Sequence, residues 1–365
     1  MKITRYPPTK NKSLRAWSAA DEYILKVLSR MEISGKNIVI CNDRFGYLAT
    51  HLHQHGPYSV TAYKSQKTSL LMNLQNNGIQ PDHEKLLNPL EPVPVAIDVG
   101  LMIVPKSLEL FRFYLQYLHR FLKEEGTVVC GFMTRHFTTQ ILSLAGACFE
   151  EVDQSLAWKK SRVLILKGKK PDPGYELTET IPYIFSDGIW QDIIQYSGVF
   201  SSGNIDYATQ FLLDHLFLQQ DENIILDLGC GNGVIARAIQ LKKPNAELHL
   251  LDDFFLAIES SRQNLQPENV HFHWSDSVDD IGNVRFDLAV SNPPFHFEHE
   301  VNTEVSINLF REVAGKLKPG GRFLCVANKH LGYQSSLKKF FTTCNVLAES
   351  NKYIIYECIK GVFTS

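Results

Sequence analysis

Short apolar runs alternate with stretches of helical periodicity through the second half of the chain. The apolar runs lie at residues 223–227, 248–251, 270–274, 286–290 and 323–327, and residues 234–241 have the spacing of a helix. Strands that alternate with helices imply βαβ units and a mainly parallel sheet. The second half is therefore predicted to be an α/β domain.

The first half repeats this pattern. Apolar runs at 37–41 and 96–104 match the runs that end near Asp227 and Ser291, so that Cys41 is paired with Asp227 and Ile103 with Ser291. Residues 122–136 (LKEEGTVVCGFMTRH) read like residues 317–330 (LKPGGRFLCVANKH). The chain is thus predicted to contain two tandem copies of one α/β fold.

A charged segment rich in Pro and Gly separates the two copies. Residues 167–180 read KGKKPDPGYELTET, a composition that resists packing and often marks a domain boundary. We predict a first domain at 1–170, a linker region at 171–190 and a second domain at 191–365.

Bulk composition restricts the cellular setting. The 365 residues are 44% hydrophobic and 21% charged with a formal net charge of −2, which gives no general attraction to nucleic acid or membrane. None of the seven cysteines forms a CxxC pair, the first residues lack a signal-peptide pattern, and no apolar run approaches the ~18 residues of a membrane helix. A cytoplasmic protein without a membrane partner is expected.

A glycine-rich turn follows the first predicted strand of the second half. Asp227 stands at the strand end, and Gly229, Gly231 and Gly233 follow at alternate positions. Glycine lets the backbone take a positive φ and pass close to a ligand. NAD(P) enzymes carry GxGxxG instead, and an inert βα turn is the other alternative. The spacing here resembles the first motif of class I S-adenosylmethionine methyltransferases.

Two further carboxylates complete the predicted cofactor site. Asp252 lies at the end of the next predicted strand, where a carboxylate can accept two hydrogen bonds from a ribose diol. Asp276 stands where class I methyltransferases usually place a polar contact to the adenine amino group, although a plain loop aspartate is an equal alternative.

A proline-stiffened segment, Asn292-Pro293-Pro294-Phe295, ends the strand at 286–290. Neither proline can continue a ladder, so the turn holds Asn292 at the sheet edge. The Asn292 side-chain oxygen and the Pro293 carbonyl can accept N–H bonds from a planar amine and favour its nucleophilic form. Phe295 can stack on a base. The segment resembles the (D/N/S)PP(Y/F) motif of methyltransferases that act on amino groups.

A metal site at His296, Glu298 and His299 is disfavoured. The spacing lacks the helical HExxH geometry, and the sequence offers no obvious further ligand. No metal is expected.

Longer segments resemble one family. Residues 199–206, 227–235 and 291–296 are similar to bacterial rRNA guanine-N2 methyltransferases with a duplicated fold, and residues 14–23, 104–110, 156–162 and 327–333 look like the subfamily that modifies large-subunit (23S) rRNA. The resemblance covers nearly the whole chain. It implies two tandem class I (Rossmann-like) methyltransferase domains, S-adenosylmethionine as cofactor, and a guanine N2 in naked or protein-poor 23S rRNA as acceptor. The protein is expected to be a monomer.

The resemblance also assigns roles to the two halves. It implies that Asn292, Pro293 and Phe295 hold the guanine, and that residues 200–206 cover the methionine end of the cofactor. The first copy has Cys41–Tyr47 (CNDRFGY) and Val104-Pro105-Lys106 in the corresponding places. It lacks the glycines and the amide, so we expect it to be a degenerate, non-catalytic platform for RNA.

Three alternatives remain open: a small-subunit (16S) rRNA guanine-N2 methyltransferase, a glutamine-amide methyltransferase, and an inactive RNA-binding or ribosome-assembly protein. Basic residues that could contact phosphates flank the predicted cleft, although single ones are more often solvated. They are Lys159, Lys160, Arg162, Lys167, Lys169, Lys170, Lys316, Lys318, Arg322, Lys329, Lys338 and Lys339.

Overall fold

The computed structural model describes most of the chain. It leaves out residues 10, 12, 175, 186, 202, 294, 295, 298, 299, 302 and 362–365, and it describes only the backbone of residues 296, 297, 300, 301 and 303–305. The described chain divides into two compact units, Met1–Leu177 and Thr178–Ser365. Among the described helices, none is long and apolar enough to cross a membrane.

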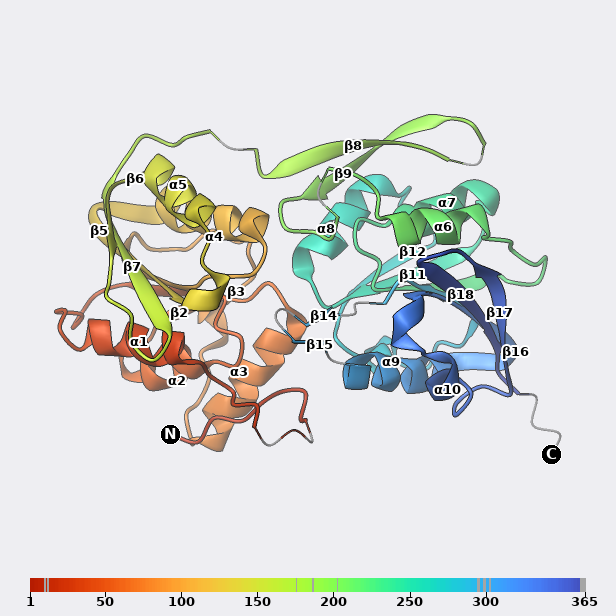
Figure 1. Ribbon diagram of the computed structural model, residues 1–365, viewed down its shortest axis with the longest axis horizontal. Coiled ribbons are helices and arrows are strands. Elements are labelled where there is room, and N and C mark those ends of the chain that lie inside the picture. The colour runs from red at the N-terminus through yellow and green to blue at the C-terminus, as the bar shows by residue number, and fades with distance from the viewer. Residues whose placement is uncertain are drawn as a thin grey trace. The chain divides into compact units, whose positions relative to one another are not determined.

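The first unit is a seven-stranded sheet with helices on both faces (Figure 1). Its strands follow the order β3-β2-β1-β4-β5-β7-β6, and β7 runs antiparallel to both of its neighbours. The strands are β1 (Ile38–Cys41), β2 (Tyr58–Val60), β3 (Leu86–Leu87), β4 (Ile97–Ile103), β5 (Leu122–Met133), β6 (Phe149–Gln154) and β7 (Ser161–Lys169). The helices are α1 (Ala19–Leu28), α2 (Tyr47–His51), α3 (Lys64–Asn76), α4 (Leu108–Phe121) and α5 (Thr139–Cys148), with short 3-10 turns η1 (His53–His55), η2 (His83–Lys85) and η3 (Thr134–His136).

The second unit contains a sheet of the same order, β12-β11-β10-β13-β16-β18-β17. Its strands are β10 (Ile224–Leu228), β11 (Glu247–Asp252), β12 (Val270–Trp274), β13 (Phe286–Ser291), β16 (Leu317–Asn328), β17 (Thr343–Glu349) and β18 (Tyr353–Ile359). The helices are α6 (Tyr207–Asp214), α7 (Val234–Lys242), α8 (Phe255–Asn264), α9 (Thr303–Lys316) and α10 (Gln334–Leu337), with 3-10 turns η4 (Val278–Ile281) and η5 (Lys329–Leu331). The identical strand order confirms the predicted duplication of one α/β fold.

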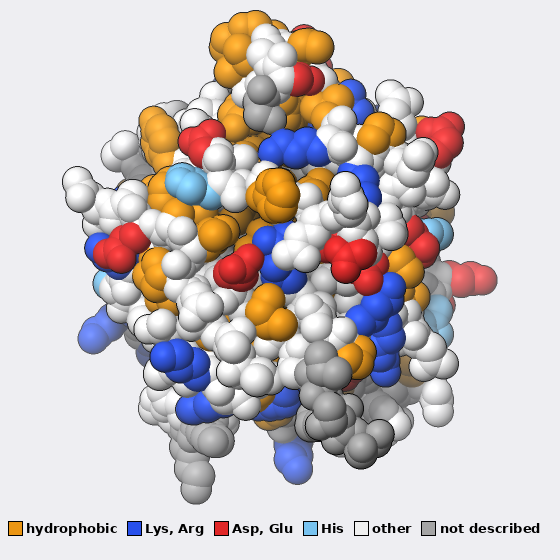
Figure 2. Space-filling view, turned by 90° about the vertical axis from the view of Figure 1, so that its right-hand side faces the viewer, with side chains coloured by type: hydrophobic (Ala, Val, Ile, Leu, Met, Phe, Trp, Pro, Cys, Tyr) orange, Lys and Arg blue, Asp and Glu red, His pale blue; other side chains and the backbone are white. Residues whose placement is uncertain are grey.

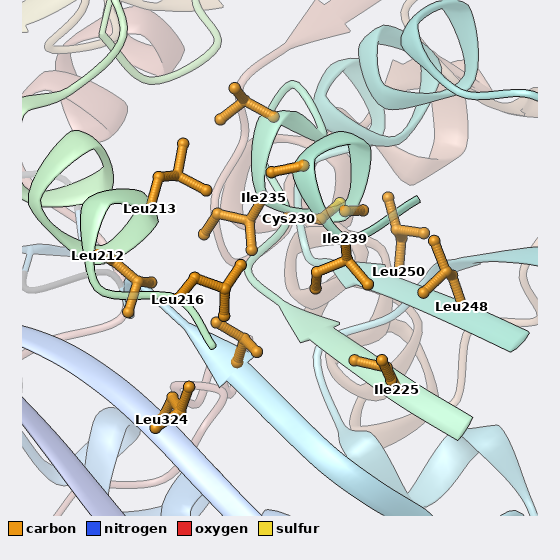
Figure 3. Packing of buried hydrophobic residues seen from close by; sticks show 14 of the residues in the cluster. Leu212, Leu213, Leu216, Ile225, Cys230, Ile235, Ile239, Leu248, Leu250 and Leu324 are labelled. Atoms are coloured by element: carbon orange, nitrogen blue, oxygen red, sulfur yellow. The ribbon is translucent and has the colours of Figure 1, made fainter. Parts of the chain in front are cut away.

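Apolar side chains fix the layers of the second unit. Alternate residues of a strand point to opposite faces of a sheet. On one face Ile225, Leu248 and Leu250 pack with side chains from α6, α7 and α8 (Figure 3). On the other face Leu226 and Leu251 pack with side chains from α9 and α10. The sheet edge formed by the carboxyl ends of the parallel strands is left for the connecting loops.

A β-hairpin precedes the second sheet, where the sequence analysis placed a linker. Its strands are β8 (Thr178–Ile184) and β9 (Trp190–Tyr196), and they belong to the second unit. The structure therefore differs from the expected linker at 171–190, since residues from 178 onward already pair and pack. Ile181 and Ile193 are buried in the core beside α6 and α7, which explains why this stretch folds. A second, very short hairpin pairs β14 (His296–Phe297) with β15 (Glu300–Val301).

Candidate active site

The glycine-rich turn joins β10 to α7, as its sequence predicts. Asp227 is buried in β10, and its Oδ2 accepts a hydrogen bond from the Ala236 backbone N–H (3.0 Å). Gly233 occupies the N-cap of α7 and has no side chain, so a strand carboxylate satisfies the third N–H of the helix instead. Within the described structure the other oxygen, Oδ1, is buried without a partner. Burial raises the pKa of the Asp227 carboxyl to about 7.

The three glycines of the turn all have positive φ angles, 68°, 55° and 79° at Gly229, Gly231 and Gly233. A Cβ on Gly233 would stand 2.8 Å from the Cβ of Ser261 in α8, so this glycine permits close helix packing. A Cβ on Gly231 would meet no described atom within 4 Å. Gly231 thus faces open space, which leaves room for a ligand to approach the backbone of the turn.

Asp252 ends β11 beside the same turn. Its Oδ2 accepts from the Gly231 N–H (3.0 Å), and its Oδ1 accepts from the Phe254 N–H (2.8 Å). Burial raises the pKa of this carboxyl. An ionised carboxylate has about four acceptor positions, so each oxygen keeps capacity for a hydroxyl donor. Asp252 therefore both fixes the turn and remains suited to a ribose diol.

Asp276 follows β12 in the half-buried segment that leads into η4. The strands β12, β11, β10 and β13 are adjacent and parallel, so their carboxyl ends share one edge of the sheet. Asp276, Asp252, the glycine turn and Asn292 consequently succeed one another along this edge. Ligands of open α/β sheets bind at such an edge.

The Asn292 side chain is held in one orientation by α6. Its Nδ2 donates to Asp206 Oδ2 (2.9 Å) and to Thr209 Oγ1 (3.0 Å). The assignment of oxygen and nitrogen follows from chemistry, because a carboxylate only accepts. Asn292 Oδ1 is buried and has no hydrogen-bond partner in the described part of the chain. The structure thus presents an oriented, vacant acceptor at the end of β13.

The rest of the predicted motif is described in part. Pro293 is buried directly after Asn292. Pro294 and Phe295 lie outside the described residues, as do Glu298 and His299, and the side chain of His296 is not described. The predictions of base stacking at Phe295 and of no metal at residues 296–299 stay predictions.

Sequence reasoning missed a polar chain that links the hairpin to the glycine turn. Asn232 Nδ2 donates to Gln195 Oε1 (2.8 Å), and Gln195 Nε2 donates to Glu179 Oε1 (2.7 Å) on the neighbouring strand. Glu179 Oε2 also accepts from the Gly203 N–H (3.1 Å). Asn232 and Gln195 are both buried, so the hairpin helps to fix the turn. The only signal in the sequence is the polar type of residues 179 and 195, which does not reveal their pairing.

Most basic residues near the predicted motif are engaged within the second unit. Arg322 is buried and pairs with Glu222 (2.8 Å) and Glu357 (2.9 Å), so the expectation that it contacts phosphate is wrong. Lys318 pairs with Asp287 at 2.7 Å. Figure 2, a view of the right-hand side of Figure 1, shows Lys and Arg side chains interspersed with Asp and Glu. On the face drawn in Figure 2, the described Lys and Arg side chains do not form a continuous basic patch.

Comparison with known proteins identifies the family. Residues 1–171 match the RLMG N-terminal domain family, and residues 191–357 match the Methyltransferase small domain family. Ribosomal RNA large subunit methyltransferase G of Shewanella loihica is 33% identical over 378 residues, which cover 99% of this chain and 93% of that protein. The chain belongs to the ribosomal RNA large subunit methyltransferase G family. The identity extends through both units, which confirms the resemblance found in the sequence.

A solved structure supports the duplicated fold of this family. The 16S rRNA N2 methyltransferase (RsmC) of T. thermophilus, in complex with AdoMet and guanosine, is similar with a TM-score of 0.77 and 21% identity. The similarity covers 97% of this chain and 94% of that one. At this identity the likeness concerns the fold, and it confirms two tandem methyltransferase-like domains.

The turn of the first unit shows how its copy degenerated. Gly46 caps α2 with a φ of 72°, as Gly233 caps α7, and Asn42 has a φ of 59° where the second unit has Gly229. Counting from these residues places Arg44 at the position of Gly231. The first unit therefore has a long side chain at the position where the second has a glycine with a positive φ.

Strand register supports this alignment and corrects the earlier one. Cys41 pairs with Met102, and Leu228 pairs with Ser291. Cys41 therefore corresponds to Leu228, and the match of Cys41 with Asp227 was wrong by one residue. Ile103 likewise corresponds to Asn292, not to Ser291. The sequence alone could not reveal this one-residue shift between the two units, because neighbouring apolar residues of a strand match almost equally well in either alignment.

Polar side chains fill the turn of the first unit. Asn42 Nδ2 donates to the Ile103 carbonyl (2.8 Å), and Asn42 Oδ1 accepts from Gln66 Nε2 (2.9 Å). Asp43 Oδ2 takes over the helix contact of Asp227 by accepting from the Ala49 N–H (2.8 Å). The first copy thus keeps the contact between a carboxylate and the start of the helix, and its turn is filled by polar side chains where the second has glycines.

Proposed function

We propose that this protein transfers the methyl group of S-adenosylmethionine to the exocyclic N2 of a guanine in large-subunit rRNA. The observation that carries the proposal is the vacant Asn292 Oδ1, held at the sheet edge beside the glycine turn. Family membership supports the acceptor, because the Shewanella loihica relative is a large-subunit rRNA methyltransferase.

The residues of the second unit fit S-adenosylmethionine, which supplies the methyl group when bound. Gly231 offers the open approach, and Asp252 retains acceptor capacity for a ribose diol. The half-buried Asp276 stands on the neighbouring strand end, in the place for a contact to the adenine amino group. We assign Asp227, Gly229 and Gly233 to the shape of the turn, because Asp227 Oδ2 and the Gly229 N–H bond to backbone groups and Gly233 packs against α8.

Asn292 suits an aromatic amine as acceptor of the methyl group. The lone pair of such an amine is delocalised into the ring, and it becomes nucleophilic when the nitrogen pyramidalises. A hydrogen bond from the amine N–H to Asn292 Oδ1 favours that geometry. A buried acceptor without a partner costs about 1–3 kcal/mol, which an incoming donor recovers. Asn292 thus binds and orients the amine, while the proton released after transfer leaves to solvent.

We further propose that the substrate is naked or protein-poor 23S rRNA, bound by a cytoplasmic monomer. The first unit serves as an RNA platform in this proposal, since its turn has lost the ligand-facing groups. On the second unit Lys338 and Lys339 are exposed after α10 and are suited to phosphate contacts.

The test uses the full chain with methyl-labelled S-adenosylmethionine and three separate acceptors: deproteinised 23S rRNA, deproteinised 16S rRNA, and a protein with a glutamine-amide methylation site. Label is expected in the 23S rRNA. Label in 16S rRNA alone would overturn the choice of subunit, and label in protein alone would overturn the choice of a nucleic-acid acceptor. If calorimetric titration detected RNA binding but no S-adenosylmethionine binding, the proposed methyl transfer would be overturned, and the protein would be an inactive RNA-binding protein.

A further inference from the structure

Three histidines and a glutamate gather on one face of the strand pair β11 and β12. Glu247 and His249 alternate along β11, and His271 and His273 alternate along β12. His249 pairs directly with His271 in the parallel register. Because alternate residues of a strand share a face, all four side chains project to the same side of the sheet. This group, the histidine cluster, lies away from the sheet edge that carries Asn292.

The donor atoms of the cluster lie at metal-binding separations. Glu247 Oε1 is 2.9 Å from His249 Nε2 and 3.6 Å from His271 Nε2. One donor atom from each of these three residues falls within 4.8 Å of the other two. Ligands at about 2.0–2.1 Å from a tetrahedral zinc ion are about 3.3 Å apart, so small side-chain movements suffice. We propose that Glu247, His249 and His271 bind a divalent transition-metal ion, Zn²⁺.

The contacts of the His249 ring favour this role, since its Nε2 lies 2.9 Å from Glu247 Oε1 and so faces the other proposed ligands. Neutral imidazole is the form that ligates metals. A metal ion at His249 Nε2 would require the neutral ring to carry its one proton on Nδ1, from which it donates to His273 Nε2. His249 Nδ1 remains 2.9 Å from His273 Nε2, a contact that fixes the orientation of the ligating ring.

Packing makes the cluster rigid on one side and accessible on the other. The His249 ring is buried, packs edge-on against Phe286 at 5.3 Å and stacks on His273 with an interplanar angle of 3°. The side chains of His271 and Glu247 are 52% and 41% exposed, which gives an ion a path to the site. Two imidazoles and a carboxylate suit zinc, nickel or copper better than magnesium or calcium, and water can fill the fourth position. A bound ion joins β12 to β11 and so stabilises the edge of the sheet.

The proposal is tested by calorimetric titration of tag-free, chelator-treated full-length protein with ZnCl2, supported by the visible absorption of bound Co²⁺. We expect one saturable site and an affinity that falls about tenfold or more in His271→Gln, which removes an exposed ligand. The control variant is His330→Gln, an exposed histidine of η5 in the same unit, which should bind Zn²⁺ like the unmodified chain.

Thermal unfolding provides a second readout, since a ligand that binds the folded state raises the midpoint. Zn²⁺ should raise the midpoint of the unmodified chain and of His330→Gln, and it should have little effect on Glu247→Gln or His271→Gln. Absence of saturable binding, or equal affinity in all four proteins, would overturn the proposal and leave a hydrogen-bonded cluster that binds no metal.

Discussion

Asp206 holds the amide of Asn292, the residue proposed to bind the acceptor amine, and Asp206→Asn tests this orienting role. The Asp206 carboxylate caps α6 by accepting from the Ala208 (3.0 Å) and Thr209 (3.2 Å) N–H groups, and it accepts from Asn292 Nδ2. With the carboxylate present, a rotated Asn292 amide would point its oxygen at a negative charge. With Asn at 206, a rotated amide finds a donor and becomes populated.

The magnitude follows from the change in hydrogen-bond type. A bond to a charged group contributes about 1.5–3 kcal/mol and a neutral bond about 0.5–1.5 kcal/mol. The difference, about 1–1.5 kcal/mol, corresponds to a loss of about tenfold in kcat. The unfolding midpoint should hardly change, because Asn caps helices about as well as Asp.

Single-turnover methylation of 23S rRNA, calorimetric titration of S-adenosylmethionine and thermal unfolding measure the three quantities. Asp214→Asn is the matched control, since Asp214 is exposed at the other end of the same helix. A lower kcat with unchanged cofactor affinity is expected for Asp206→Asn alone. An unchanged kcat, or a loss confined to cofactor affinity, would refute the orienting role.

Two further predictions concern the glycine turn. Gly231→Val should weaken S-adenosylmethionine binding more than tenfold in calorimetry, because it fills the open approach and strains a backbone with a φ of 55°; unchanged affinity would place the cofactor elsewhere. Burial raises the pKa of the Asp227 carboxyl from 3.8 to about 7, so the folded chain binds this proton more tightly than the unfolded chain. The free energy of unfolding therefore falls as pH rises from about 4 to about 7. At 1.36 kcal/mol per pKa unit, the fall is roughly 4 kcal/mol. Asp227→Asn should therefore raise the unfolding midpoint at pH 8 and have little effect at pH 4. An equal change at both pH values would contradict a raised pKa of the buried Asp227 carboxyl.

The sequence predicted the strands β10, β11, β12, β13 and β16 and the glycine turn, because apolar runs and glycine spacing are local signals, but it did not predict β17 and β18. It predicted the helix after Gly233 and the strand before Asn292 within a residue or two of α7 and β13. It assigned the hairpin β8–β9 to a linker because charged, Pro- and Gly-rich residues precede it. The burial of Ile181 and Ile193 that makes it fold depends on contacts with distant helices.

The hydrogen-bond partners of the site side chains could not be predicted from the sequence. Asp206 and Asn292 are 86 residues apart, and Asn232 and Gln195 are 37 apart, so their hydrogen bonds exist only once the sheet has formed. The histidine cluster had a visible alternation on each strand, but the register of β11 and β12 was needed to bring His249 beside His271. Local pattern thus located the site, and tertiary packing determined its chemistry.

Nucleoside analysis of treated 23S rRNA tests directly whether this protein methylates guanine N2. Deproteinised 23S rRNA from cells that lack this enzyme is incubated with S-adenosylmethionine and protein, digested to nucleosides and analysed by mass spectrometry against N2-methylguanosine. We expect one added N2-methylguanosine with the unmodified chain and with Asn345→Ala, which removes an exposed amide on β17. We expect a yield at least about a hundredfold lower with Asn292→Ala, the loss typical of removing a group that contacts the reacting atoms. A methyl group on another atom of the RNA, or full yield from Asn292→Ala, would contradict the proposed function.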